Sequence, residues 1–200
     1  MIRNELQPAA CRILSVKHES MHEWTFRVAT DINVSHGQFM QLSIPRVGEA
    51  PISVSMQGDG WLEFTLRPVG KVTNEIFEKK AGEYLFLRGP YGNGWPKHRI
   101  DGKHLVVITG GTGLAPVRSL LNHYYDHMDE IKDIHLISGF KNDESIVFTE
   151  DLAKWKEKFT TIYALDNDEK EGFRTGMVTA FVSEIPWKDF GEDYTVLVVG

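Results

Sequence analysis

The sequence predicts two domains: an antiparallel six-stranded β-barrel over residues 1–100, then an α/β domain with a doubly wound parallel sheet over residues 101–200. Hydrophobic residues alternate along short segments before residue 100, whereas strand-like and helix-like segments alternate after it. The segment between them, Gly89-Pro90-Tyr91-Gly92-Asn93-Gly94-Trp95-Pro96, is rich in glycine and proline. We therefore place the domain boundary in this segment or just after it.

The predicted barrel consists of segments with the period of a half-buried strand. In residues 61–67, Leu62, Phe64 and Leu66 alternate with Trp61, Glu63, Thr65 and Arg67. Strands are expected at Ala10–Val16, Glu23–Ala29, Phe39–Ile44, Ile52–Met56, Trp61–Arg67 and Glu83–Arg88. A short helix is expected over Lys71–Lys79, where the apolar residues fall on one side.

The second domain alternates strands with helices, which is typical of a parallel sheet. Strands are expected at His104–Thr109, Ile134–Ser138, Thr160–Leu165 and Tyr194–Val199, and helices at Leu114–Asp126, Phe148–Lys158 and Val178–Phe181. The last predicted strand reaches the end of the chain and leaves a sheet edge open. We therefore expect this domain to be incomplete at its C-terminus.

Bulk composition excludes several classes of protein. A hydrophobic content of 42%, a charged content of 25% and a net charge of −6 predict a folded globular chain that binds neither nucleic acid nor an anionic membrane. No apolar run approaches the ~20 residues of a membrane span. Arg3, Asn4 and Glu5 stand where a secretion signal would be apolar, so the cytoplasm is the expected location.

Metal-binding residues are sparse in the sequence. The single cysteine, Cys11, forms no internal disulfide and cannot hold an iron–sulfur cluster alone, so we expect a small apolar residue on the first strand. His123 and His127 have a spacing that suits a metal, but no third ligand is evident. We interpret them as part of a polar helix face and predict no metal site.

A glycine-rich turn follows the first strand of the second domain. It reads Gly110-Gly111-Thr112-Gly113-Leu114-Ala115-Pro116 and leads directly into a predicted helix. Glycines permit a tight turn and close approach of the backbone to a ligand. The N–H groups and dipole at the helix start favour an anion, and proline suits the first helical turn. The turn therefore predicts a site for a phosphate-bearing ligand, although its spacing is neither G-x-G-x-x-G nor a P-loop.

Three stretches in this order resemble the ferredoxin–NADP reductase superfamily. They are residues 48–55 (GEAPISVS), 87–94 (LRGPYGNG) and 110–120 (GGTGLAPVRSL). Within the superfamily they look most like the electron-transfer subunits of anaerobic sulfite reductases, with those of dihydroorotate dehydrogenases as near relatives. The resemblance covers nearly the whole chain. It implies that the barrel binds FAD and that the second domain binds the nicotinamide nucleotide.

The resemblance also implies a set of FAD-binding residues. The superfamily's Arg-x-Tyr-Ser motif aligns with Ala50, Pro51, Ile52 and Ser53. The Ser53 hydroxyl would position flavin N5, and Ile52 would cover the isoalloxazine ring. The guanidinium that pairs with the FAD pyrophosphate is missing at Ala50, and Arg67 is our candidate to replace it. The second flavin motif aligns with Gly70, Lys71, Val72 and Thr73, where backbone N–H groups, the Thr73 hydroxyl and the Lys71 charge would hold the pyrophosphate.

For the nicotinamide nucleotide, the resemblance implies that the 110–116 turn binds the pyrophosphate. It places the adenosine ribose near Gly139, Phe140 and Lys141, which follow the second parallel strand. Lys141 has the charge to meet the 2′-phosphate of NADPH, but a single lysine favours that cofactor weakly. The subunits that this chain resembles mostly look NADH-linked, so the resemblance implies NADH as the donor, with NADPH as the alternative.

The function implied by the resemblance is a relay. Hydride passes from NADH to FAD, and single electrons pass to the iron–sulfur and catalytic subunits of a multi-subunit reductase that converts sulfite to sulfide. A 2Fe–2S cluster is expected only in a full-length form, because this chain lacks the cysteines. Service to a dihydroorotate dehydrogenase or a hydrogenase is one alternative. A flavin-binding module without turnover and a nucleotide-binding fold without flavin are others.

Overall fold

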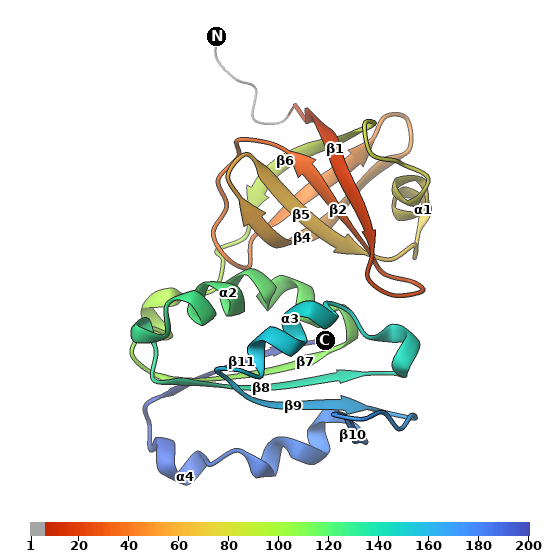
Figure 1. Cartoon of the computed structure of the whole chain (residues 1–200). Helices are drawn as coiled ribbons and strands as arrows, with labels where there is room; N and C mark the ends of the chain where they lie inside the picture. Colours follow the sequence, from red (N-terminus) through yellow and green to blue (C-terminus); the bar gives the residue numbers. More distant parts are fainter. Residues whose placement is uncertain (1–6) are drawn as a thin grey trace. The chain divides into compact units, whose positions relative to one another are not determined.

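Six antiparallel strands close into a barrel in the first half of the chain (Figure 1). The computed structural model describes residues 7–200, so the N-terminal residues Arg3, Asn4 and Glu5 lie outside the described part. The strands are β1 (Ala9–His18), β2 (Trp24–Ala29), β3 (Phe39–Ile44), β4 (Gly48–Gly58), β5 (Trp61–Leu66) and β6 (Tyr84–Tyr91), in the order β1-β2-β5-β4-β3-β6. The predicted six-stranded barrel is confirmed.

The barrel interior is filled by alternate residues of each strand. Leu62, Phe64 and Leu66 of β5 are at most 4% exposed, as their alternation predicts, and Cys11 of β1 is also buried. Helix α1 (Lys71–Phe77) adds Ile76 to this core. The short helix predicted there is therefore confirmed, and its packing against the core fixes the turn that precedes it.

The polar face of β5 differs from the half-buried strand predicted from the alternation. Glu63 and Thr65 are each only 6% exposed. Burial is tolerated because both side chains are hydrogen-bonded: Arg27 donates to Glu63 at 2.7 and 2.9 Å, and the hydroxyls of Thr65 and Thr25 are 2.8 Å apart. The alternation of apolar and polar residues predicted the strand correctly, but it wrongly predicted that the polar face would be exposed.

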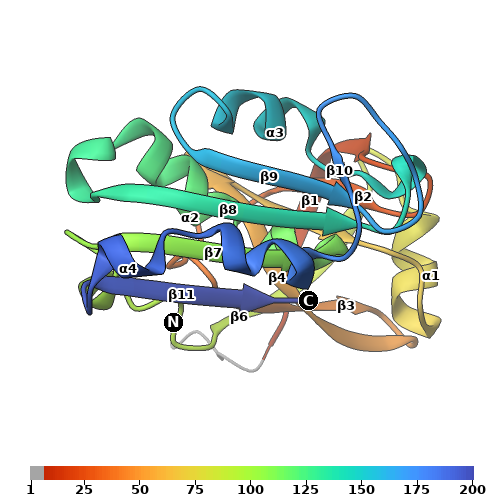
Figure 2. The ribbon, with the colours of Figure 1, turned by 90° about the horizontal axis from the view of Figure 1, so that it is seen from below.

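The second half of the chain forms a parallel five-stranded sheet in the order β10-β9-β8-β7-β11. Its strands are β7 (His104–Gly110), β8 (Asp133–Phe140), β9 (Thr160–Leu165), β10 (Arg174–Thr175) and β11 (Tyr194–Val199). Its helices are α2 (Ala115–Asp126), α3 (Thr149–Trp155) and α4 (Trp187–Phe190), and the 3₁₀ segment η5 (Val178–Glu184) precedes α4. Figure 1 shows α2 and α3 on one face of the sheet and the 178–190 segment on the other, which Figure 2 shows from below.

This arrangement confirms the predicted doubly wound sheet, with local differences. The helix expected over Phe148–Lys158 begins at Thr149, because Phe148 has a left-handed backbone (φ 57°) that a right-handed helix does not accept. The two-residue strand β10 and the four-residue helix α4 were not predicted, since elements this short carry no periodicity. The helix expected at Val178–Phe181 is a longer 3₁₀ segment.

Contacts divide the chain into two units, and each is described by itself. The first ends at Trp95 and also takes in Ala115–Ser119, while the second consists of Pro96–Leu114 and Leu120–Gly200. A boundary at residue 100 stays a prediction. Within residues 7–200, no helix is long and apolar enough to cross a membrane.

A polar network anchors the start of the second unit. The Lys97 ammonium lies 2.6 Å from Glu130 Oε2 and 2.8 Å from His123 Nε2, and His123 Nε2 is itself 2.8 Å from Glu130. His123 thus contacts charged side chains on the polar helix face predicted for it. The hydrogen bond from Lys97, followed by that from His123, lowers the pKa of Glu130 from 4.5 to about 2.

Replacing Glu130 is expected to destabilise the chain in a pH-dependent way. Because the folded-state pKa lies below the ordinary value, the ionised carboxylate contributes its full stability above pH 4.5 and loses it as pH falls toward 2. Glu130→Gln should therefore lower Tm at pH 7, with a difference from wild type that shrinks below pH 4.5. Thermal unfolding across this range measures it, with Asp129→Asn as the exposed-carboxylate control. A difference independent of pH would contradict the assignment.

Candidate functional site

The turn after β7 approaches the end of β11 very closely. Gly110 ends β7, Gly111 adopts a left-handed backbone (φ 52°), and residues 111–114 form a 3₁₀ turn that continues into α2. A Cβ added at Gly113 would lie 2.4 Å from the Val199 carbonyl oxygen, which is backbone and cannot give way easily. Glycine is therefore required at position 113 by packing, and at position 111 by conformation.

This turn lies at the point where the strand order reverses. From β7 the chain continues to β8 and β9 on one side, and it returns through β11 to the other side of β7. Open α/β sheets bind ligands outside the carboxyl ends of their strands at such a switch point. The remaining turn residues, Thr112, Leu114, Ala115 and Pro116, lead into α2, and Pro116 occupies its first turn. The geometry suits the predicted pyrophosphate site.

The structure places Gly139 directly beside Gly110, because β7 and β8 are in register at these residues. A Cβ at Gly139 would lie 2.4 Å from Val178 Cγ1. Phe140 is 2% exposed, so its ring belongs to the core and only its backbone faces the strand end. Lys141 is exposed. Of the three residues predicted near the adenosine ribose, only Lys141 offers a side chain to solvent at this edge.

In the barrel, the predicted flavin-positioning residues lie on β4 opposite β3. Pro51 pairs with Gln41, Ile52 with Met40, and Ser53 with Phe39. Ile52 is partly buried against the barrel core, and Ser53 is half-buried. Because successive side chains of a strand point to opposite faces, Ile52 and Ser53 are not on the same face of β4.

The loop between β5 and α1 holds the other predicted FAD residues. Arg67 is exposed and lies 3.8 Å from Glu23. The Thr73 hydroxyl accepts hydrogen bonds from the N–H groups of Val69 and Gly70, both at 3.0 Å, and donates to the Gly70 carbonyl at 3.1 Å. This hydroxyl closes the turn within the protein. What the turn offers a ligand is the backbone N–H groups of the first helical turn, at Lys71 and Val72.

Two neighbours of these residues were not identified from the sequence. A Cβ at Gly48 would lie 3.3 Å from Val72 Cγ2, so the start of β4 contacts the first turn of α1. The Gln41 Oε1 atom is buried, and no hydrogen-bond donor reaches it within residues 7–200. Neither feature has a sequence signal, because both depend on strands brought together by the barrel. Backbone donors at the α1 turn and an unpaired acceptor beside β4 fit a polar cofactor such as FAD.

The second half of the chain matches a known protein family. Residues 107–200 match the oxidoreductase NAD-binding domain family. The match begins within β7 and includes the 110–116 turn and the end of β8. It is consistent with a nucleotide site at the strand ends.

The curated relatives include subunits of a sulfhydrogenase and of a probable dihydroorotate dehydrogenase. The chain is 35% identical over 141 residues to sulfhydrogenase 1 subunit gamma of Pyrococcus furiosus, covering 70% of this chain and 46% of that protein. It is 31% identical over 133 residues to the probable dihydroorotate dehydrogenase B (NAD(+)) electron transfer subunit of the same organism, covering 66% of this chain and 49% of that protein. The chain spans about half the length of these relatives.

Solved structures show the same fold. The ferredoxin NADP⁺ reductase from Neisseria gonorrhoeae with bound FAD and NADP superposes with a TM-score of 0.81 at 20% identity, covering 96% of this chain and 85% of that one. Since the identity is low, this likeness establishes the fold alone. The barrel followed by a parallel sheet is the arrangement of these reductases.

Adding one methyl group at Gly113 is expected to disrupt the turn. Gly113→Ala places its Cβ against the Val199 carbonyl, and overpacking of this kind typically costs about 1–3 kcal/mol. Chemical denaturation should show this loss, and NADH binding should weaken because the turn must move. Thr112→Ala, which adds no atoms near β11, serves as the control for the stability measurement alone. Unchanged stability would contradict the close packing.

The Thr73 hydroxyl is expected to stabilise the chain by closing the turn before α1. Thr73→Val removes the acceptor of the Val69 and Gly70 N–H groups, and since these residues are exposed, we expect the ordinary loss of about 0.5–1.5 kcal/mol per hydrogen bond. Thr73→Ser retains the hydroxyl and should stay close to wild type. Thermal unfolding distinguishes the two variants, and equal melting temperatures would show that the turn does not depend on this oxygen.

Proposed function

We propose that this chain, a member of the ferredoxin–NADP reductase superfamily, is an electron-transfer subunit that accepts hydride from NADH onto FAD and passes single electrons to an iron–sulfur partner. The observation that carries the proposal is the glycine turn Gly110–Gly113 at the switch point of a parallel sheet, preceded in the chain by a barrel of the reductase type. The electron-transfer subunits among the relatives support it.

Each cofactor region has a defined task in this proposal. FAD, when bound, supplies the chemistry that takes a hydride and releases electrons one at a time. The N–H groups at the 110–116 turn bind the dinucleotide pyrophosphate, and the backbone of Gly139 and Phe140 lies beside the ribose. The Ser53 hydroxyl orients the flavin edge from one face of β4, and the exposed part of Ile52, on the other face, remains our candidate to cover the ring. No acid or base is required from the protein.

Charge near the ends of β8 and β9 favours NADH over NADPH. The loops that follow these strands carry acidic residues: Asp143, Glu144, Asp166, Asp168, Glu169 and Glu171. Asp168 accepts a hydrogen bond from the Asp143 backbone N–H at 2.9 Å, and Lys170 pairs with Asp143 at 2.5 Å. Lys141 remains as an exposed cation. The acidic excess repels a 2′-phosphate, because like charges brought together cost binding energy.

The terminal acceptor is assigned by resemblance. The motifs of residues 48–55, 87–94 and 110–120 favour sulfite, reduced to sulfide on another subunit of a cytoplasmic complex. The relatives named for a sulfhydrogenase and a dihydroorotate dehydrogenase support the competing assignments. In each case the half-reaction of this chain is the same, and a full-length form carrying a 2Fe–2S cluster would pass the electrons on.

The purified chain, loaded with FAD, should lose its flavin absorption band on anaerobic addition of NADH. NADPH should require a higher concentration to produce the same bleaching. A yellow protein that NADH fails to bleach would identify a flavin-binding module without turnover. A chain that takes up no FAD would overturn the proposal.

A further inference from the structure

A cavity of about 600 Å³ lies on the barrel at the hairpin that joins β3 to β4. It is bounded by the hairpin, by β6 and by the residues that precede β1. Its apolar wall is formed by Pro8, Ile44, Pro45, Val47 and Phe86. The cavity is distinct from the residues assigned to FAD by the motifs, and all of its lining belongs to the first unit.

Within residues 7–200, one positive charge in the lining of the cavity has no acidic partner. Ser43, Arg46 and Glu49 supply polar groups to its lining. The Glu49 carboxylate is neutralised by Arg88, whose Nη2 lies 2.5 Å from Glu49 Oε1, and this hydrogen bond raises the pKa of Arg88. Within residues 7–200, no carboxylate lies within ion-pair distance of Arg46, which is exposed. The cavity therefore favours a ligand that combines a flat apolar group with an anion.

Arg46 is held in a conformation that the residue does not favour. The Val47 N–H donates to the Ile44 carbonyl at 3.0 Å, which closes a tight turn with Pro45 and Arg46 at its centre. Arg46 has φ 66°, in the left-handed region where glycine or asparagine is preferred. Strained residues of this kind gather at ligand-binding sites, where the side chain is required at that position.

The cavity meets the predicted pyrophosphate turn at Gly48. Gly48 lines the cavity and also contacts Val72 in the first turn of α1. Ser53 lies five residues further along β4, which corresponds to about 17 Å at the usual rise of a strand. A ligand with its ring system at Ser53 and its phosphates at the α1 turn would therefore direct its other end toward the hairpin cavity.

We infer that this cavity takes the AMP half of FAD, with the Arg46 guanidinium pairing with a phosphate and Phe86 and Pro8 contacting the adenine. The inference rests on the proposed function. Arg46 then supplies the charge that is missing at Ala50, in place of Arg67, which lies beside Glu23.

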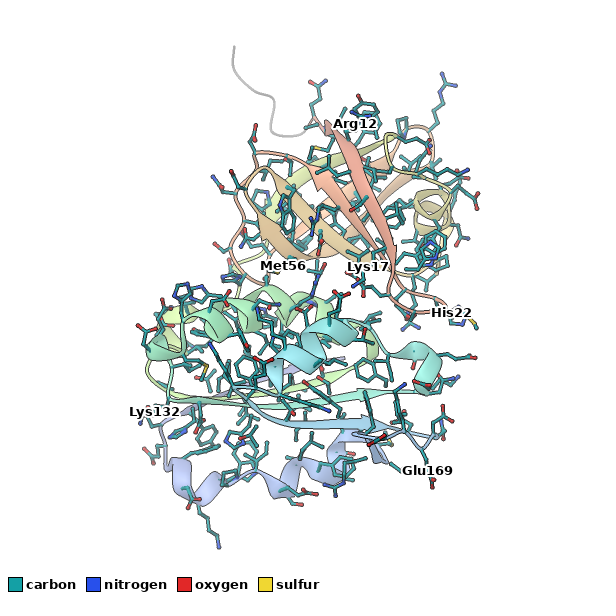
Figure 3. All side chains as sticks on the ribbon, viewed as in Figure 1. Arg12, Lys17, His22, Met56, Lys132 and Glu169 are labelled. Carbon is teal, nitrogen blue, oxygen red and sulfur yellow. The ribbon has the colours of Figure 1, made fainter. Side chains whose placement is uncertain are left out.

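Flavin titrations of the apoprotein test the inference, because FMN lacks the AMP half. Wild type should bind FAD more tightly than FMN, and Arg46→Gln should weaken FAD binding about tenfold or more, as expected for loss of a charged hydrogen bond. The same change should leave FMN binding unaltered. AMP should compete with FAD for wild type but not for Arg46→Gln. Arg12→Gln, at an exposed arginine of β1 labelled in Figure 3, is the matched control.

A second variant separates binding from folding. Arg46→Gly retains the left-handed backbone without strain, so it should melt no lower than wild type while binding FAD as weakly as Arg46→Gln. Unchanged FAD affinity in both variants would overturn the inference and leave the proposed function intact. AMP that binds wild type without displacing FAD would also overturn it, by assigning the cavity to a free nucleotide. A wild-type chain that binds no flavin would overturn the inference and the proposed function together.

Discussion

The nucleotide end of the parallel sheet depends on how closely the turn after β7 packs against β11. The Cα of Gly113 occupies a position where any side chain would meet the Val199 carbonyl oxygen. Because this contact joins two backbones, it fixes the start of α2 against the sheet without relying on a flexible side chain. The N–H groups of the turn are then held at the strand ends, where the reversal in strand order leaves room for a ligand.

In the barrel, too, packing within the protein holds a turn whose backbone N–H groups can contact a cofactor. Thr73 closes the turn before α1 through its own hydroxyl, and Ile76 packs that helix into the barrel core. The donors presented to a cofactor are again backbone groups. This arrangement is compatible with alanine at position 50, because the cation for a pyrophosphate need not come from the motif residue itself. A charge on the neighbouring hairpin is in a position to replace it.

Much of this fold could be predicted from the sequence where periodicity is strong. The strands Phe39–Ile44, Thr160–Leu165 and Tyr194–Val199 have the predicted bounds, because alternation or an apolar run in the sequence marks each of them. Helix α3 starts one residue later than predicted, since the left-handed backbone of Phe148 has no signature in its residue type. The same holds for Arg46, whose conformation is set by the turn around it.

The candidate site was predictable only in part for a related reason. The glycine turn could be predicted from the sequence, because closely spaced glycines between a strand and a helix indicate a tight turn that a ligand can approach. The contact between Gly48 and Val72, the unpaired oxygen of Gln41 and the cavity at the β3–β4 hairpin arise from residues distant in the sequence. Their proximity is a property of barrel closure, and residue type alone does not reveal it.

The most direct test of the central claim is a kinetic isotope effect on flavin reduction. The FAD-loaded chain would be mixed anaerobically with NADH or with NADH carrying deuterium at the transferred position of nicotinamide C4, and the flavin band followed by stopped flow. If hydride passes from NADH to the flavin, bleaching should occur with both donors and should be slower with deuterium. Absence of bleaching with either donor would contradict the proposed relay.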